Sequence, residues 1–187
     1  MKPYFAFILL AALPAVLAQA APPDPFLVVP GRSLGRVHLG LRGGADIKRL
    51  PHPDGNGTSK HGIYFAVWKS KNGPDTLAVN GFNLDYAQPP RPGLKIDEIR
   101  ATSPQFHTSG GLAPGATLAE IKRHYPKGSL GPASQGPDVY YDVTGKGLGF
   151  EFPAHPVANT KSLAIGVVEA TDKATLSAQD VQSYLEK

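Results

Sequence analysis

Two groups of apolar, β-branched and aromatic runs predict strands along the chain. The runs IYFAVWK at 63–69 and VYYDV at 139–143 have the strongest strand-forming composition. A second run follows each after a turn rich in Gly, Asn or Thr, and such turns suit hairpins. A third run closes each group as an antiparallel meander. The predicted strands span 63–69, 76–82 and 94–103 in the first group, and 139–143, 147–152 and 161–171 in the second.

Helical spacing precedes the second group of strands. Thr117 with Glu120 three residues later is a capping box, which opens a helix by satisfying free backbone N–H groups. Leu118, Ile121 and Tyr125 recur at three- and four-residue spacing and form one apolar face. We therefore expect an amphipathic helix that packs on the sheet formed by the strands that follow it.

Two further helices are predicted. Before the first group of strands, Gly43 and Gly44 each lower helix stability by about 1 kcal/mol relative to Ala, so we expect a short helix over 45–50. Near the end of the chain, a capping box at Ser177 opens a helix over 178–186.

The order of a helix followed by strands occurs twice. The sequences DIKR at 46–49 and EIKR at 120–123 lie 74 positions apart and occupy the same place in the two groups. Such self-similarity indicates a duplicated structural unit. We predict an α+β fold of two tandem units, each a helix packed on an antiparallel three- to four-stranded sheet, plus a C-terminal helix. The first unit spans 28–93 and the second 94–187, with strand 94–103 completing the first sheet.

The first twenty residues have the pattern of an export signal. Lys2 gives a positive start, residues 5–17 are apolar, and AQA at 18–20 is a small-x-small cleavage sequence. We expect cleavage after Ala20, a flexible mature terminus over 21–27, and a periplasmic or secreted protein. The apolar stretch is shorter than the ~20 residues that cross a membrane as a helix, so no transmembrane segment is predicted.

Composition narrows the function classes by exclusion. The chain has no Cys, which excludes disulfides, thiolate metal sites and a lipid anchor on cysteine. Its net charge is +4 and the basic residues are scattered, so we do not expect nucleic acid as a partner. The six histidines lack the spacing of a metal site on one helix or strand. We therefore expect neither a metal nor a cofactor.

One short sequence matches a catalytic motif. GRSLG at 31–35 fits G-x-S-x-G, which in hydrolases places a nucleophilic serine on a turn between a strand and a helix. Here the motif leads into a short predicted strand over 36–39, so a turn into the first strand is the preferred interpretation. We do not predict an enzyme, and a serine hydrolase that uses Ser33 is the less favoured alternative.

The aromatic residues of the predicted strands suggest a binding surface. If the helices cover the aliphatic faces, one Trp and two Tyr side chains lie together on the other side of the sheet. Tyr and Trp are enriched at the energetic centres of protein interfaces. Alternatively, the linker 87–93 or the terminal helix covers this side. The predicted partner-binding residues, three aromatic and three from a basic rim, are Tyr64, Trp68, Tyr140, Lys69, Lys71 and Lys122.

Two stretches of the chain resemble known envelope proteins. PGRSLGRVHLGL at 30–41 and TSGGLAPGATLAEI at 108–121 are similar to the strand, Gly-turn and helix openings of proteins resembling β-lactamase inhibitory protein. The small outer-membrane assembly lipoproteins of the same helix-on-sheet superfamily open similarly. The resemblance covers most of 28–171 and implies a helix-on-sheet fold. This chain carries neither the lipidated Cys of those lipoproteins nor the disulfides of the secreted inhibitors.

The duplicated unit and the lack of a catalytic constellation favour a function by binding. The favoured hypothesis is an exported, non-catalytic protein-binding module of the bacterial envelope, acting as an inhibitor or an assembly accessory. Its partner is then another envelope or secreted protein. The alternative is a periplasmic protein that binds a small apolar ligand between its two units.

Overall fold

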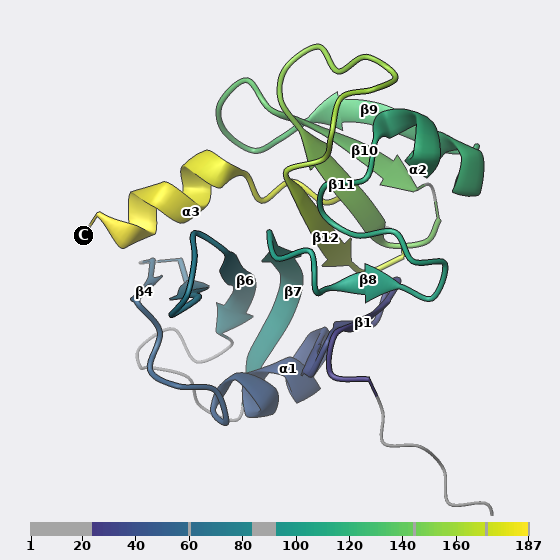
Figure 1. Cartoon of the computed structure of the whole chain (residues 1–187). Coiled ribbons are helices and arrows are strands. Elements are labelled where there is room, and N and C mark those ends of the chain that lie inside the picture. Colours follow the sequence, from purple (N-terminus) through teal and green to yellow (C-terminus); the bar gives the residue numbers. More distant parts are fainter. Residues whose placement is uncertain (1–23, 60, 84–92, 144, 171, 187) are drawn as a thin grey trace, which may run out of the picture.

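The computed structural model describes residues 24–59, 61–83, 93–143, 145–170 and 172–186 (Figure 1). The predicted export signal at 1–20 and nearly all of the linker 87–93 lie outside the described residues. None of the helices in the described ranges has the length and apolar character that a membrane span requires.

The described residues form three helices and two sheets. The helices are α1 (Gly40–Ile47), α2 (Leu118–His124) and α3 (Ala178–Leu185). The small sheet has the order β3-β2-β1-β8, with strands β1 (Leu27–Val29), β2 (Ser33–Leu34), β3 (Val37–His38) and β8 (His107–Thr108). The large sheet has the order β4-β5-β6-β7-β12-β11-β10-β9, with strands β4 (Gly55–Thr58), β5 (Ile63–Lys69), β6 (Thr76–Asn83), β7 (Leu94–Ala101), β9 (Gly128–Pro132), β10 (Val139–Val143), β11 (Leu148–Phe152) and β12 (Ala164–Val168).

The two repeated halves join edge to edge in the large sheet. β7 of the first half pairs antiparallel with β12 of the second, with Ile165 opposite Ala101 and Gly166 opposite Arg100. Each half contributes a helix followed by four strands in meander order, and the order β4-β5-β6-β7 is mirrored by β12-β11-β10-β9. The predicted α+β class, with helices on antiparallel sheet and a C-terminal helix, is confirmed.

The outer strands β4 and β9 are not predicted by the residue pattern. Their sequences, GNGT and GSLGP, are rich in Gly, end in Pro in β9, and contain Thr58 as their one β-branched residue. Pairing with a neighbour forms them: Thr58 lies opposite Tyr64, and Gly128 lies opposite Val143. Because an edge strand has a neighbour on one side only, it tolerates residues that would break a central strand.

Helix α1 begins and ends earlier than the helix predicted over 45–50. It contains Gly43 and Gly44 despite their low helix propensity. A Cβ on Gly43 would lie 2.0 Å from the carbonyl oxygen of His38, and one on Gly44 would lie 2.4 Å from that of Leu94. The missing side chains let the helix lie directly against β3 and β7, so packing outweighs propensity at this position.

The other two helices begin with the predicted capping boxes. The backbone N–H of Glu120 donates to Oγ1 of Thr117 at 3.2 Å, and that of Asp180 donates to Oγ of Ser177 at 3.1 Å. In both helices the acidic side chain accepts in return from the backbone N–H of the cap residue. The sequence therefore predicts the start of α2 and of α3 correctly.

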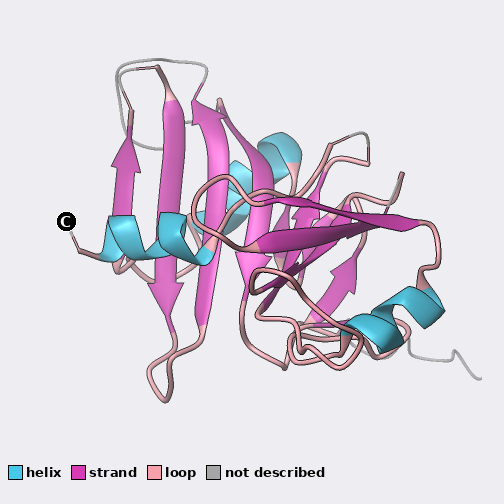
Figure 2. Cartoon of the chain, turned by 90° about the horizontal axis from the view of Figure 1, so that it is seen from above, coloured by secondary structure: helices cyan, strands magenta, loops and turns pink. Residues whose placement is uncertain are grey.

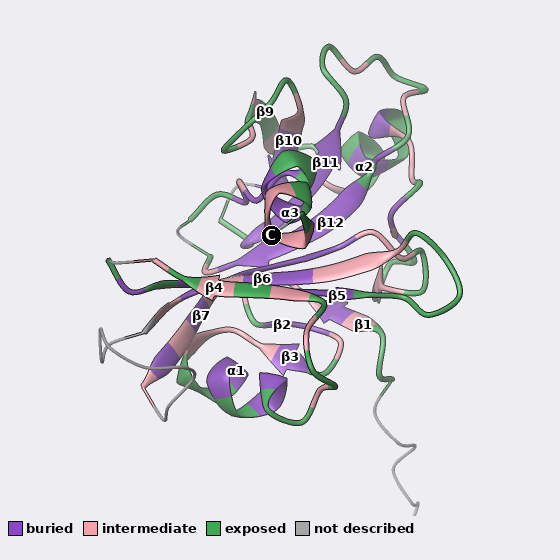
Figure 3. Ribbon diagram, turned by 90° about the vertical axis from the view of Figure 1, so that its left-hand side faces the viewer, coloured by how far each residue is buried: buried purple, intermediate pink, exposed green. Residues whose placement is uncertain are grey.

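Both faces of the large sheet are covered (Figures 2 and 3). One face belongs to the main apolar core, which includes Val28 of the small sheet, Ile47 of α1 and Ile121 of α2. The other face carries two smaller clusters: Leu176 and Val181 pack on β5 and β6, and the segment before α3 packs on the second half of the sheet. Double coverage explains why a strand such as β5 is apolar on both sides.

Candidate functional site

The three aromatic residues predicted to bind a partner do not form an exposed surface. Tyr64 and Trp68 are 5% and 9% exposed and belong to the main core, and burial raises the pKa of the Tyr64 hydroxyl. Tyr140 is fully buried on the opposite face, where its hydroxyl donates to the carbonyl oxygen of Leu176 at 2.6 Å. The expectation of one shared aromatic face is corrected, because α3 and the segment before it cover the side on which Tyr140 lies.

The three lysines of the predicted basic rim are exposed but lie in different halves of the molecule. Lys69 ends β5, and Lys71 follows it in the turn to β6. Lys122 belongs to α2 of the second half, where its Nζ lies 5.9 Å from the centre of the Tyr141 ring. The structure therefore does not bring the lysines together around the aromatic residues.

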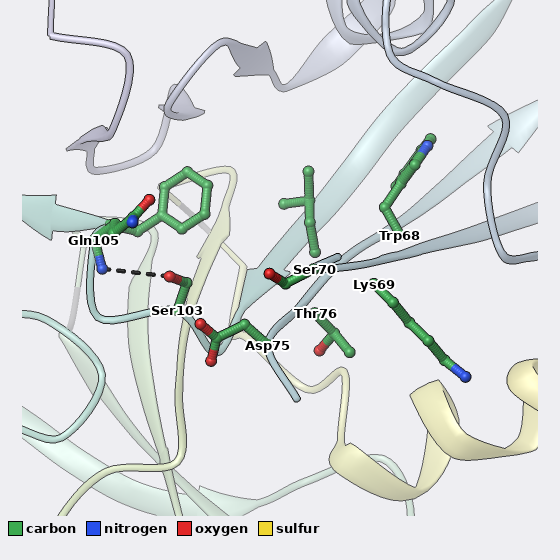
Figure 4. A pocket seen from close by; sticks show the side chains of 9 residues that line it. Trp68, Lys69, Ser70, Asp75, Thr76, Ser103 and Gln105 are labelled. Carbon is green, nitrogen blue, oxygen red and sulfur yellow. Dashed lines mark hydrogen bonds between the residues drawn. The ribbon is translucent and has the colours of Figure 1, made fainter. Parts of the chain in front are cut away.

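Trp68 and Lys69 line a small pocket at one end of β5 and β6 (Figure 4). Its volume is about 210 Å³. The indole N–H of Trp68 is already used, since it donates to the carbonyl oxygen of Pro51 at 2.7 Å. In Figure 4 the Lys69 side chain extends away from Ser103 and Gln105. The pocket is smaller than the ~300 Å³ at which small-molecule sites usually begin, so it is not the best candidate site.

A larger cavity lies between the small sheet and helix α1. Its volume is about 750 Å³, within the range of ~300–1,000 Å³ that is typical of small-molecule sites. Apolar side chains from β1, β3 and the end of the α1 region contribute to its wall: Leu27, Val29, Val37 and Leu50. Polar and charged side chains complete it: Asp24, Ser33, His38, Asp46, Arg36, Arg42 and Arg49.

A tight hairpin places Ser33 and His38 side by side. Gly35 and Arg36 form the two-residue turn between β2 and β3, and Ser33 lies directly opposite His38. The backbone N–H of Leu39 donates to the carbonyl oxygen of Arg32 at 2.8 Å, which makes Arg32 and Leu39 a hydrogen-bonded pair. Because the two kinds of pair alternate in an antiparallel ladder, Ser33 and His38 form a pair without backbone hydrogen bonds between them. Facing side chains come closest in pairs of this type. Both residues therefore present their side chains to the same end of the cavity.

Asp46 of α1 fixes the orientation of the His38 ring. Its Oδ2 accepts a hydrogen bond from Nδ1 of His38 at 2.7 Å and a second from the His38 backbone N–H at 3.2 Å. Because a carboxylate only accepts, Nδ1 carries the proton. The other ring nitrogen, Nε2, makes no hydrogen bond to a described residue. The His38 side chain thus keeps one free polar atom beside the cavity.

The hydroxyl of Ser33 is also free. Ser33 is 4% exposed, and its side chain makes no hydrogen bond to any residue in the described ranges. Yet in the same ranges no fully enclosed side-chain nitrogen or oxygen lacks a partner. The Ser33 oxygen therefore retains contact with open space, and the space that Ser33 lines is this cavity.

Three arginines give the cavity a basic rim. Arg36, Arg42 and Arg49 are exposed, and only Arg49 approaches a described carboxylate, with Nη1 3.7 Å from Oδ1 of Asp46. The second carboxylate at the cavity, that of Asp24, is engaged by His107 at 3.2 Å. The guanidinium groups of Arg36 and Arg42 therefore remain available to an anion.

Sequence reasoning identifies Ser33 in this site but misses the residues around it. Ser33 lies in β2 and follows β1, so the preferred interpretation of GRSLG as a turn into the first strand is wrong; the residue also does not stand between a strand and a helix. The pairing with His38 has a sequence signal, because a two-residue turn over 35–36 places positions 33 and 38 opposite each other. The contact with Asp46 has none, since it depends on how α1 packs against β3. Within the described residues, no group of three or more His, Asp or Glu side chains could hold a metal ion.

Comparison with known proteins adds information on the fold. No protein-family model and no curated protein matches the sequence. Among solved structures, the fold is similar to that of the uncharacterised protein YfeY from Escherichia coli, with a TM-score of 0.54. The two are 15% identical, and the match covers 75% of this chain and 99% of that one. At this level of identity the likeness shows a shared fold and nothing about activity.

Proposed function

We propose that this chain is an exported binding protein that takes a small organic anion into the cavity between the small sheet and α1. The ligand has an apolar body and one acidic group, a carboxylate or a phosphate. The observation that carries the proposal is a combination in one cavity of about 750 Å³: a buried serine whose hydroxyl has no partner among the described residues, and two exposed arginines that form no ion pair with a described residue.

The chemistry of the lining supports an amphipathic ligand. Leu27, Val29 and Leu50 offer apolar surface, which favours burial of a hydrocarbon body. Arg36 and Arg42 offer guanidinium groups, which bind carboxylates and phosphates through paired N–H donors. Within the cavity the free atoms of Ser33 and His38 supply hydrogen bonds that orient a polar group of the ligand. The export signal predicted at the start of the sequence supports a function outside the cytoplasm.

The proposal is tested by titration with straight-chain carboxylates. Heat of binding and thermal shift are measured with a series from acetate to decanoate, with hexyl phosphate, and with the matching n-alkanols as uncharged controls. We expect binding that strengthens with chain length and is lost in the alcohols. The double variant Arg36→Gln/Arg42→Gln should weaken binding at least about tenfold, the effect of losing one charge-assisted hydrogen bond.

A matched control stands in the same hairpin. Arg32 is exposed and does not line the cavity, so Arg32→Gln should leave the affinity unchanged. Equal binding of acids and alcohols, or equal loss in the Arg32 variant, would contradict a site for anions in this cavity. Absence of binding across the whole series, phosphate ester included, would contradict the proposed ligand class.

A second candidate function, a serine hydrolase, is favoured by one observation. His38 donates to Asp46 through Nδ1 and lies across the hairpin from Ser33, as the base of a Ser-His-Asp triad lies between its partners. Catalysis also requires Nε2 of His38 to take the proton of the Ser33 hydroxyl, and the two are not hydrogen-bonded here. Binding requires only the side chains that line the cavity and no hydrogen bond between Ser33 and His38, so it comes first.

The two functions are separated by a covalent probe. A fluorophosphonate that reacts with activated serines should label the chain if Ser33 is a nucleophile, and labelling should disappear in Ser33→Ala. Under the binding proposal the probe leaves the chain unlabelled and p-nitrophenyl esters are not turned over. Binding to another envelope or secreted protein stays a prediction, but the buried aromatic residues are not the surface that would contact such a partner.

A further inference from the structure

Five polar or charged side chains are buried at the centre of the large sheet, on the face that α3 covers. Glu98 and Arg100 belong to β7, Tyr140 and Asp142 to β10, and Glu151 to β11; all are at most 8% exposed. Buried charges are costly unless they are paired and hydrogen-bonded. Each of the five side chains therefore needs hydrogen-bonding or charged partners, and those partners show what this polar face binds.

Two glycines in the strands open a furrow across this face. Across the sheet, Gly166 pairs with Arg100 on one side and with Gly149 on the other. A Cβ on Gly149 would lie 2.8 Å from Cβ of Ala174, and one on Gly166 would lie 3.0 Å from it. The missing side chains thus leave room for the chain segment that precedes α3.

The carboxylates of the sheet hold that segment by its backbone. Glu98 accepts from the backbone N–H of Thr175 at 2.8 Å and from that of Leu176 at 2.9 Å, and the Thr175 hydroxyl lies 3.3 Å from its other oxygen. Asp142 accepts from the backbone N–H of Ala174 at 3.1 Å. These bonds require an extended segment at this position but no particular side chain except that of Thr175.

The start of α3 is held in the same way. Glu151 accepts from the backbone N–H of Ala178 at 2.9 Å, and it also forms a buried ion pair with Arg100, whose Nε lies 2.7 Å away. The Tyr140 hydroxyl also holds the segment, since it donates to the carbonyl oxygen of Leu176. Residues 173–186 are therefore attached to the sheet through buried acidic groups, in addition to the apolar contacts of Leu176 and Val181 with β5 and β6.

We propose that residues 173–186 form a pH-sensitive latch, which is docked when Glu98 is protonated and is released as Glu98 ionises. Glu98 contacts the segment at the point where it crosses the furrow, before α3 begins. Release leaves the two meanders of the large sheet intact, because none of their strand pairs includes a residue of the segment.

The direction of the switch follows from the surroundings of Glu98. Burial raises the pKa of Glu98 to about 7, outweighing the hydrogen bonds from Leu176 and Thr175 that lower it, and the negative charge of Asp142 raises it further. Once the segment leaves, the carboxyl meets water and its pKa returns to its ordinary value near 4.5. The docked state thus binds the proton more tightly, and rising pH favours release.

The other charged groups around the segment act mainly in the same direction. Burial also raises the pKa of Asp142 and of Glu151, so that both are easier to ionise when the segment is away. Arg100 opposes this at Glu151, and Lys173 opposes it at Asp142. The Tyr140 hydroxyl, whose pKa burial raises far above 10, stays protonated throughout. Glu98 is the group whose carboxyl changes from protonated to ionised near neutral pH.

Hydrogen–deuterium exchange of the full chain tests the latch. Protection factors, corrected for the intrinsic pH dependence of exchange, are measured for the peptides of 173–186 and of β10–β11 between pH 5 and pH 8.5. We expect protection of 173–186 to fall on the order of 100-fold across this range, while the strands keep theirs. Glu98→Gln should remove the fall, and Asp97→Asn, which changes an exposed carboxyl on the same strand, should retain it.

A second variant keeps the test decisive if Glu98→Gln does not fold. Thr175→Val removes the hydroxyl bond to Glu98, which stabilises the ionised carboxylate, so the midpoint of the fall should move to higher pH. The latch is overturned if 173–186 stays equally protected at every pH in the unmodified chain. It is also overturned if the strands lose protection together with the segment, or if the protection of 173–186 falls with pH in Glu98→Gln as it does in the unmodified chain. The third contradicting result is a Thr175→Val variant in which the midpoint of the fall stays in place or moves to lower pH.

Discussion

Nδ1 of His38 lies 2.7 Å from Oδ2 of Asp46, and this contact joins the small sheet to helix α1. The same oxygen also accepts the backbone N–H of His38. One carboxylate, 8% exposed, therefore sets both the ring of His38 and the position of β3 against the helix. Because β3 and α1 form two sides of the cavity, the shape of the proposed binding site depends on this pair.

Replacement of Asp46 by Asn should lower the stability of the chain. The amide lacks the charge that strengthens both hydrogen bonds, so we expect the free energy of unfolding to fall by about 1–3 kcal/mol. Urea denaturation followed by circular dichroism measures the change. Asp172→Asn, at an exposed position outside the cavity, is the control and should be neutral; equal stability of the two variants would show that the Asp46 contact is dispensable.

Trp68 should behave as a core residue and not as a contact surface. Its side chain is 9% exposed and packs in the main core, so Trp68→Ala should lower the free energy of unfolding by about 3–5 kcal/mol. The neighbouring Lys69 is exposed, and Lys69→Ala should stay within about 0.5 kcal/mol of the unmodified chain. Unchanged stability of the Trp68 variant would restore the idea of an exposed aromatic face.

The helix caps and central strands could be predicted from residue patterns, whereas the site could not. Thr117 and Ser177 predict the starts of α2 and α3, because a capping box is formed by residues only three positions apart in the sequence. Strand β5 shows in the sequence as a run that is apolar on both faces. The sequence does not show which element covers each face, because α3, far along the chain, covers one of them. The Asp46–His38 contact and the furrow at Gly149 depend on elements that meet only in the folded chain, so no spacing rule finds them.

A methyl group in the furrow should loosen the C-terminal segment. Gly149→Ala places its Cβ 2.8 Å from Cβ of Ala174 and 2.9 Å from the Tyr140 ring, so the segment has to shift. We expect a loss of about 1–3 kcal/mol in the free energy of unfolding, the usual cost of overpacking. Gly73→Ala meets no atom within 4 Å and should be close to neutral by the same thermal or urea measurement; a neutral Gly149 variant would show that the furrow has spare room.

Stability should decrease as the pH rises through neutrality. The pKa of Glu98 is raised by burial to about 7 in the folded chain, against 4.5 for the exposed group, so its stabilising effect is complete below pH 4.5 and is lost as the pH passes 7. The difference between the unmodified chain and Glu98→Gln isolates this effect, and it should change on the order of 3 kcal/mol between pH 4.5 and pH 8. Urea midpoints at several pH values measure it; a difference that moves in the opposite direction would mean that the hydrogen bonds to Glu98 outweigh its burial.

Two-dimensional NMR of the ¹⁵N-labelled chain, titrated with decanoate, tests the proposed binding cavity most directly. We expect the largest chemical-shift changes in the hairpin and α1, at Ser33, His38 and Arg42, with saturation at increasing ligand and no matching response to decanol. Residues of α2, such as Lys122, should stay unperturbed. Shifts centred on other elements, or equal shifts with the acid and the alcohol, would contradict an anion-binding cavity between the small sheet and α1.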